Sequence, residues 1–256
     1  MDIKMIVCDL DGTLLRSDKT VTRRTLDALD KCRRQGIIFA VATARSVTGA
    51  RMFTDHMMPD ALVYNGGSAV QVAGIKIYEN PMPSGLVSVL VNELLGRGVT
   101  NFSAENDEGY FYHGNRYEYA DYLKGFGLTI GQINPEGQMP PLHKLTAEIS
   151  GDKAKQIVEK YLEIGIVTYT DTQMVRFARK DATKWHGIKV LAEHFGVNTA
   201  NIVAFGDDNN DLDMLENCGI GVAMGNAINE AKTTANFICD TNDKDGVARW
   251  LEEKIW

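Results

Sequence analysis

Residues 5–13 read MIVCDLDGT, a short apolar run that ends in two aspartates, a glycine and a threonine. A continuous apolar run of this length is typical of a parallel strand that is covered on both faces. Asp9 and Asp11 lie two residues apart at the end of the strand, so their side chains tend to point the same way. Gly12 lets the backbone turn and approach a ligand closely. The stretch predicts a sheet strand that ends in a pair of carboxylates.

The same alternation of strands and helices recurs in the first and final thirds of the chain. Helices are expected over 22–34 and 185–195, and further strands over 37–42, 61–64, 202–205 and 220–224. This alternation predicts an α/β fold with a doubly wound, mostly parallel sheet, in which ligands bind outside the carboxyl ends of the strands. Polar clusters follow three of these strands: Thr43-Ala44-Arg45, Asn65-Gly66-Gly67 and Gly206-Asp207-Asp208-Asn209-Asn210-Asp211.

The middle third of the chain has a different pattern, because none of its expected strands ends in an acidic cluster. Helices are expected over 84–95 and 154–161, and strands over 146–150 and 174–178. These elements predict a smaller α/β domain inserted into the first one. The predicted division is a core domain of residues 1–82 and 181–256 and an inserted domain of residues 83–180.

The composition and charge of the chain argue against a nucleic-acid-binding or membrane protein. With 44% hydrophobic and 24% charged residues, the 256-residue chain is ordinary for a soluble globular protein. The net charge of -7 argues against a broad surface for nucleic acid or an anionic membrane. The four cysteines are scattered, and no apolar stretch approaches the ~20 residues that span a bilayer. We therefore expect a cytoplasmic protein with no nucleic-acid or membrane partner; its oligomeric state is not predicted.

The acidic clusters predict a metal site if the fold brings them together. Two carboxylates about 4 Å apart repel by roughly 4 kcal/mol at an effective dielectric of 20. The repulsion among four carboxylates in one crevice would be intolerable without a cation. The four residues concerned are Asp9, Asp11, Asp207 and Asp211. Oxygen ligands favour a hard ion, and a site with few carboxylates and retained water suits Mg²⁺.

The order of these motifs resembles the haloacid dehalogenase superfamily. Its four motifs are matched by residues 9–13, by Thr43 at the end of the second strand, by the late Lys184, and by the 206–211 stretch. Residues 221–227, which read GVAMGNA, and the earlier Asn-Gly-Gly at 65–67 resemble the Cof-type, capped sugar-phosphatase branch. The resemblance implies that the inserted α/β domain is a cap between the second and third motifs.

The resemblance also implies roles for the acidic residues. Asp9 would be the nucleophile that takes the phosphoryl group, and Asp11 the general acid and base. Mg²⁺ would be bound by the Asp9 carboxylate, the Asp11 main-chain carbonyl and Asp207, with Asp211 as a nearby or water-mediated support. Asp208 would be a spectator.

Other positions match the family's phosphate holders. Thr43, Lys184, Asn210 and the backbone N–H groups near Leu10 and Ala44 would together stabilise charge on the transferring phosphoryl group. Two departures from the pattern occur: Ala44 replaces the usual glycine, and Trp185 follows the lysine. The second departure makes Lys180 a rival to Lys184, although the helix pattern favours Lys184. Trp185 is expected to be a packing residue.

The function implied is a Mg²⁺-dependent phosphatase that acts on small phosphorylated metabolites, sugar phosphates first among them, through an aspartyl phosphate on Asp9. Two alternatives stay open. One is a phosphomutase, because similar capped relatives return the phosphoryl group to a sugar. The other is a catalytically silent phosphate-binding regulator, although binding alone has no need of the acid at Asp11.

Overall fold

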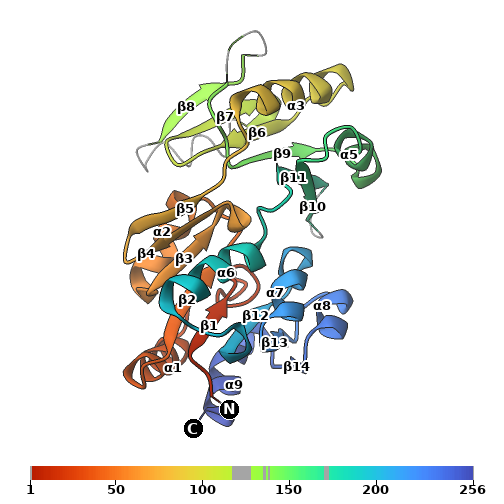
Figure 1. Cartoon of the computed structure of the whole chain (residues 1–256). Coiled ribbons are helices and arrows are strands. Elements are labelled where there is room, and N and C mark those ends of the chain that lie inside the picture. The colour runs from red at the N-terminus through yellow and green to blue at the C-terminus, as the bar shows by residue number, and fades with distance from the viewer. Residues whose placement is uncertain (1, 117–127, 135–136, 138, 170–172, 256) are drawn as a thin grey trace. The chain divides into compact units, whose positions relative to one another are not determined.

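The computed structural model describes residues 2–116, 128–134, 137, 139–169 and 173–255. The chain divides into two compact units, each with its own sheet (Figure 1). The first unit comprises Met1–Ala44, Met52–Tyr78 and Thr183–Trp256, and the second comprises Arg45–Arg51 and Glu79–Ala182. The α/β class and the mostly parallel sheet with a second, smaller α/β unit are confirmed.

The first unit contains an eight-stranded sheet in the order β14-β13-β12-β1-β2-β3-β4-β5. From β14 to β3 the paired neighbours are parallel, and β4 runs antiparallel to β3. The sequence did not predict β4 and β5, which are joined by a tight turn at Ala73 and Gly74, both with positive φ. The bounds are β1 Met5–Cys8, β2 Ile38–Ala42, β3 Ala61–Tyr64, β4 Ala69–Val72, β5 Ile75–Glu79, β12 Ile202–Gly206, β13 Ile220–Ala223 and β14 Phe237–Ile238.

Helices cover both faces of this sheet, which is why β1 is a continuous apolar run. On one face, Ile188 and Met214 pack with Met5 and Val7 of β1. On the other face, the ring of Phe205 meets that of Trp250 edge-on, with centroids 5.3 Å apart. The helices are α1 Arg23–Arg34, α2 Val47–Met57, α6 Lys184–Phe195, α7 Leu212–Asn217, α8 Asn229–Thr234 and α9 Gly246–Lys254.

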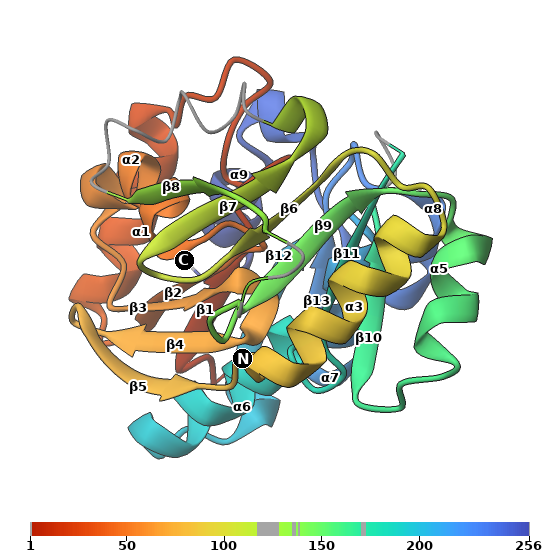
Figure 2. The ribbon, with the colours of Figure 1, turned by 90° about the horizontal axis from the view of Figure 1, so that it is seen from above.

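The second unit contains a six-stranded sheet in the order β10-β11-β9-β6-β7-β8. The helices described in this unit, α3 and α5, lie over one face, where Leu90 and Ile157 pack against Phe102 and Phe177 (Figure 2). The bounds are α3 Ser84–Gly96, β6 Phe102–Glu105, β7 Gly109–His113, β8 Thr129–Gln132, β9 Lys144–Glu148, α5 Gly151–Val158, β10 Ile164–Thr168 and β11 Met174–Arg179.

Helix α3 and strand β11 each extend one residue beyond their predicted ends, and two other elements of the second unit differ more from their predicted bounds. The helix expected over 154–161 is α5, which begins at Gly151 because Ser150 takes the extended backbone of an N-cap. The strand expected over 146–150 is β9, which therefore ends before that cap, at Glu148. No helix in the described part of the chain is long and apolar enough to cross a membrane.

Candidate functional site

Carboxylates from two distant parts of the sequence meet at the ends of β1 and β12. Carboxylate oxygens of Asp9, Asp207 and Asp211 all lie within 4.8 Å of one another. β1 and β12 are neighbouring parallel strands in which Cys8 is paired with Phe205, so their carboxyl ends lie at one edge of the sheet. The two acidic clusters quoted from the sequence therefore form one site within the first unit.

Lys184 bridges two of these carboxylates. Its Nζ lies 2.5 Å from Asp9 Oδ1 and 2.6 Å from Asp211 Oδ1, and its side chain has no exposed surface. Burial alone would lower the pKa of Lys184, but the Asp211 and Asp9 carboxylates raise it above the ordinary value. The side chain is therefore an ammonium throughout the neutral range. Lys180, the rival position, is exposed and lies in the second unit.

The start of α6 fixes the position of Lys184. Thr183 is the N-cap, and its hydroxyl accepts a hydrogen bond from the N–H of His186 at 3.2 Å. Trp185 is half-buried against the apolar core beside α6, as expected of a packing residue. Gly67, which follows β3, has a φ of +100°, and a Cβ atom there would lie 1.8 Å from the carbonyl oxygen of Thr183. Only glycine fits this contact.

Gly67→Ala is expected to displace the start of α6 and to destabilise the protein by about 3 kcal/mol, since backbone strain and a steric clash add. Urea unfolding would measure the change. Gly74→Ala is the matched control, because Gly74 also has positive φ (+79°) but nothing within 4 Å of its added Cβ. The free energy of unfolding of that variant should fall only by the strain of an alanine at positive φ, about 1 kcal/mol. Equal losses in the two variants would contradict the steric argument.

Asp211 organises the loop that carries Asp207. Its Oδ2 accepts hydrogen bonds from the N–H groups of Asp207 at 2.9 Å and Asp208 at 3.1 Å, while its Oδ1 is bonded to Lys184. Asp208 caps the same turn, because its side chain accepts a bond from the N–H of Asp211. Both oxygens of Asp211 are thus engaged by protein groups, which suits a supporting position.

Two contacts at the Asp11 turn were not predicted. The hydroxyl of Thr13 donates to Asp207 Oδ1 at 2.9 Å and so ties the β1 loop to the β12 loop. Lys19 Nζ lies 2.9 Å from Asp11 Oδ1, and both side chains are partly exposed. Thr13 lies within the quoted motif, so its position could have indicated the contact. No periodicity or motif in the sequence indicates Lys19.

The candidate phosphate holders lie at the same sheet edge. Thr43 is buried just after β2, and its carbonyl accepts a hydrogen bond from the N–H of Gly66 at 2.9 Å. Leu10 has no exposed surface, so only its backbone could serve a ligand. Ala44 is not among the described residues with positive φ, so its methyl group is accommodated without strain. Asn210 is half-buried in the short 3₁₀ turn Asn209–Asp211.

The charges at the site fit a divalent cation. Three carboxylates and one ammonium leave an excess of two negative charges. Burial, followed by the nearby Asp211 carboxylate, raises the pKa of Asp207 to about 7. Burial also raises the pKa of Asp9, with Lys184 opposing the shift and Asp211 adding to it. Oxygen donors with excess negative charge are what a hard cation such as Mg²⁺ prefers.

Burial of the Asp207 carboxyl, with the nearby Asp211 carboxylate, makes the stability of the metal-free protein depend on pH. The pKa of Asp207 is raised from its ordinary value of 3.8 to about 7 in the folded protein, so between these pH values the folded state holds one proton more than the unfolded state. The free energy of unfolding should fall as pH rises through that range, by roughly 1 kcal/mol per pH unit. Thermal unfolding in EDTA at about pH 5 and about pH 8 would measure the slope. An equal slope in Asp207→Asn would contradict this assignment.

Comparison with known proteins identifies the family of the chain and agrees with its fold. The sequence model of the haloacid dehalogenase-like hydrolase family matches residues 6–251 of this chain. The chain belongs to this family, and the predicted enzyme class, a phosphoric monoester hydrolase of haloacid dehalogenase type, is confirmed. The resemblance to the capped branch is confirmed as well.

Individual relatives span the full chain. A Haemophilus influenzae protein named "Putative phosphatase" is 31% identical, covering 100% of this chain and 99% of its own. The Bacillus subtilis 5-amino-6-(5-phospho-D-ribitylamino)uracil phosphatase YitU is 30% identical, covering 97% and 96%. A haloacid dehalogenase-like hydrolase structure from Bacteroides thetaiotaomicron has a TM-score of 0.83 at 25% identity, covering 99% and 100%. The subclass IIB sugar phosphatase BT4131 has a TM-score of 0.84 at 22% identity, covering 98% of both chains, and shares the fold.

Proposed function

We propose that this enzyme is a Mg²⁺-dependent phosphatase of small phosphorylated metabolites and that it transfers the phosphoryl group to Asp9. The observation that carries the proposal is the buried Asp9 carboxylate, bonded to Lys184 and set among the carboxylates of Asp207 and Asp211. Three Bacillus subtilis relatives are named as phosphatases of a phosphoribitylamino-uracil, which supports a phosphorylated sugar or sugar alcohol as substrate.

The proposed reaction has two steps. A carboxylate oxygen of Asp9 attacks phosphorus, the bond to the leaving alcohol breaks, and the carboxylic acid of Asp11 gives its proton to the leaving oxygen. Water then attacks the phosphorus of the aspartyl phosphate and gives a proton to the Asp11 carboxylate. The bond to Asp9 breaks, and inorganic phosphate leaves with Asp9 restored.

The residues that would hold Mg²⁺ are Asp9, Asp207 and the main-chain carbonyl of Asp11, with Asp211 as support. When bound, the ion offsets the negative charge that would otherwise repel an anionic ester. Asp211 keeps the loop in place through Lys184 and two backbone N–H groups.

The protein groups proposed to bind the phosphoryl oxygens are Thr43, Lys184, Asn210 and the backbone at Leu10 and Ala44. Lys184 is the strongest of these, because it is a fully buried ammonium next to the attacking carboxylate. Charge that develops on the transferring group in a buried site is stabilised far more than it would be in water.

The domain division and the compartment belong to the same proposal. We assign residues 1–82 and 181–256 to a catalytic core and residues 83–180 to an inserted cap. The four cysteines, Cys8, Cys32, Cys218 and Cys239, are free thiols, which supports a reducing, cytoplasmic setting.

The test is a phosphate-release assay of the full chain with a panel of esters and Mg²⁺. The panel covers hexose, pentose, nucleotide and pyridoxal phosphates and a phosphorylated ribitylamino-uracil. We expect release from at least one ester, its loss in EDTA and its return with Mg²⁺. Interconversion of sugar phosphates without release would instead identify a phosphomutase. Inertness toward every ester, with phosphate binding retained, would identify a silent regulator.

A further inference from the structure

The turn after β13 contacts the backbone of both acidic loops. The side-chain Nδ2 of Asn226 donates a hydrogen bond to the carbonyl of Gly12 at 2.8 Å. Two residues later, the N–H of Ile228 donates to the carbonyl of Asp207 at 2.9 Å. A single short segment, 226–228, is thus bonded to the loop that carries Asp9 and Asp11 and to the loop that carries Asp207.

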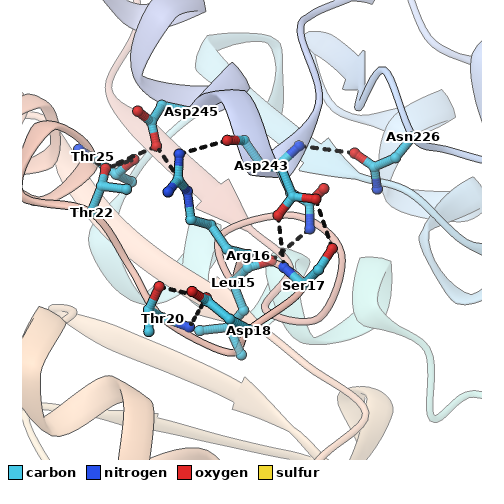
Figure 3. A network of polar contacts seen from close by, with 11 residues as sticks. Leu15, Arg16, Ser17, Asp18, Thr20, Thr22, Thr25, Asn226, Asp243 and Asp245 are labelled. Carbon is cyan, nitrogen blue, oxygen red and sulfur yellow. Dashed lines mark hydrogen bonds and ion pairs between the residues drawn. The ribbon is translucent and has the colours of Figure 1, made fainter.

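Asn226 is itself held from the other side. Its Oδ1 accepts a hydrogen bond from the N–H of Asn242 at 2.9 Å, and Figure 3 shows the side chain turned toward the segment that carries Asp243. Asn242 is buried, and its Nδ2 donates to the carbonyl of Leu15 at 2.8 Å. The two asparagines therefore connect the carbonyl of Gly12 to that of Leu15, at the two ends of the turn formed by residues 12–15.

A second set of bonds lies further out on the same loop. The N–H and hydroxyl of Ser17 donate to the carboxylate of Asp243 at 2.8 and 2.7 Å, and Arg16 contacts Asp243 and Asp245 (Figure 3). Ser17 and Asp243 are exposed, and so is Asn226, so the two sets of bonds differ in which part of the loop they hold and not in burial. The outer set secures the loop to the C-terminal part of the chain, whereas Asn226 acts at the turn itself.

A small displacement of the Gly12 backbone would change the proposed metal site. Gly12 has a φ of +80°, and a Cβ atom there would lie 2.2 Å from Asp207 Oδ2, so this turn is packed directly on Asp207. The next residue, Thr13, donates to Asp207 Oδ1, and the preceding one, Asp11, offers the main-chain carbonyl proposed as a ligand. A shift of this peptide would therefore move two proposed ligands at once.

The geometry points to Asn226 as a positioning residue of the metal site, which fixes the spacing between the Asp11 turn and Asp207. This inference rests on the proposed function, because it concerns the Mg²⁺ site of that mechanism. The Asn226 side chain bonds to the backbone of Gly12 and Asn242 and not to the side chains proposed for catalysis, so it would act through the backbone of Gly12. The amide is required at both ends: the nitrogen donates to Gly12 and the oxygen accepts from Asn242.

The experiment measures Mg²⁺ binding by calorimetry on the EDTA-stripped full chain, together with kcat and KM for an ester that the wild type hydrolyses. In Asn226→Ala we expect Mg²⁺ affinity to fall by about tenfold or more and kcat to fall similarly, as for other groups that orient metal ligands. KM for the ester measured at saturating Mg²⁺ should change by less than about threefold, because the phosphate holders are untouched. A purely structural role would lower the unfolding temperature without changing Mg²⁺ affinity.

Two further variants sharpen the test. Asn226→Asp keeps the acceptor for Asn242 but loses the donor to Gly12, so it should weaken Mg²⁺ binding as Asn226→Ala does. Asn229→Ala is the matched control, an exposed asparagine of α8 with no side-chain bond among the described residues, and it should bind Mg²⁺ as the wild type does. Wild-type Mg²⁺ affinity in both Asn226 variants would overturn the inference. A wild type that binds Mg²⁺ but hydrolyses no ester would overturn the proposed function alone.

Discussion

Asp9→Asn is expected to abolish phosphate release, with a loss of about 10⁴-fold or more, while the fold stays intact. The reason is chemical: the amide is no nucleophile toward phosphorus, and the covalent step has no substitute group. The substitution also removes one of the excess negative charges around Lys184, so the metal-free protein should be at least as stable as the wild type. Steady-state phosphate release and thermal unfolding in EDTA would measure the two effects.

Asp208→Asn is the matched control for that experiment. Asp208 lies in the neighbouring loop after β12, where it caps the 3₁₀ turn, and asparagine caps equally well, so activity should stay close to that of the wild type. Substantial turnover by Asp9→Asn would contradict the assignment of the nucleophile. Unfolding of Asp9→Asn at room temperature would contradict the expectation that this variant is at least as stable as the wild type.

Lys184→Met is expected to have the largest effect on stability. The substitution leaves Asp9 and Asp211 buried without the ammonium that lies 2.5 and 2.6 Å from them. Breaking a buried ion pair by removing one partner typically costs about 3–5 kcal/mol. The loss should be greater at alkaline than at acidic pH, because burial raises the pKa of Asp9 and alkaline pH favours its charged form. Denaturant unfolding in EDTA at two pH values would measure it.

Lys189→Met provides the control on the same helix. Lys189 is exposed, and its Nζ lies 5.8 Å from the ring centroid of Trp185, so its loss should change stability by less than about 1 kcal/mol. If Lys184→Met is no less stable than Lys189→Met, then Lys184 does not stabilise the buried carboxylates of Asp9 and Asp211. The account of the site's electrostatics would then be wrong.

The central parallel strands β1, β2, β3, β12 and β13 were predictable because they are buried on both faces, whereas β4, β5 and β14 were not predicted. Runs such as residues 5–8 and 202–205 are apolar throughout, and each ends in a polar cluster. Helix α1 was predictable as well, because Thr22 is a good N-cap and Gly36 follows the helix with positive φ. The second sheet was harder: β6, β7, β8 and β10 are short, and their polar and apolar residues do not alternate cleanly enough to mark a strand.

The sequence predicted that Asp9, Asp207, Asp211 and Lys184 lie together, as they do, but it did not predict their contacts. The pairing of Lys184 with Asp9 joins positions 175 residues apart, and that of Thr13 with Asp207 joins positions 194 residues apart. No local pattern encodes such distances; the motif order indicated them only through the family resemblance. The role of Asn226 was missed for the same reason, since its partners Gly12 and Asn242 lie in separate parts of the chain.

The most direct measurement is to find where the phosphoryl group is bound during turnover. The full chain, and Asp11→Asn to slow breakdown of the intermediate, would be mixed with Mg²⁺ and a radiolabelled ester that the wild type hydrolyses, and then quenched in acid. Peptide mapping should place the label on the peptide that contains Asp9, and the label should be absent from Asp9→Asn. Phosphate release with no label on that peptide in either protein, or a label elsewhere, would contradict the account.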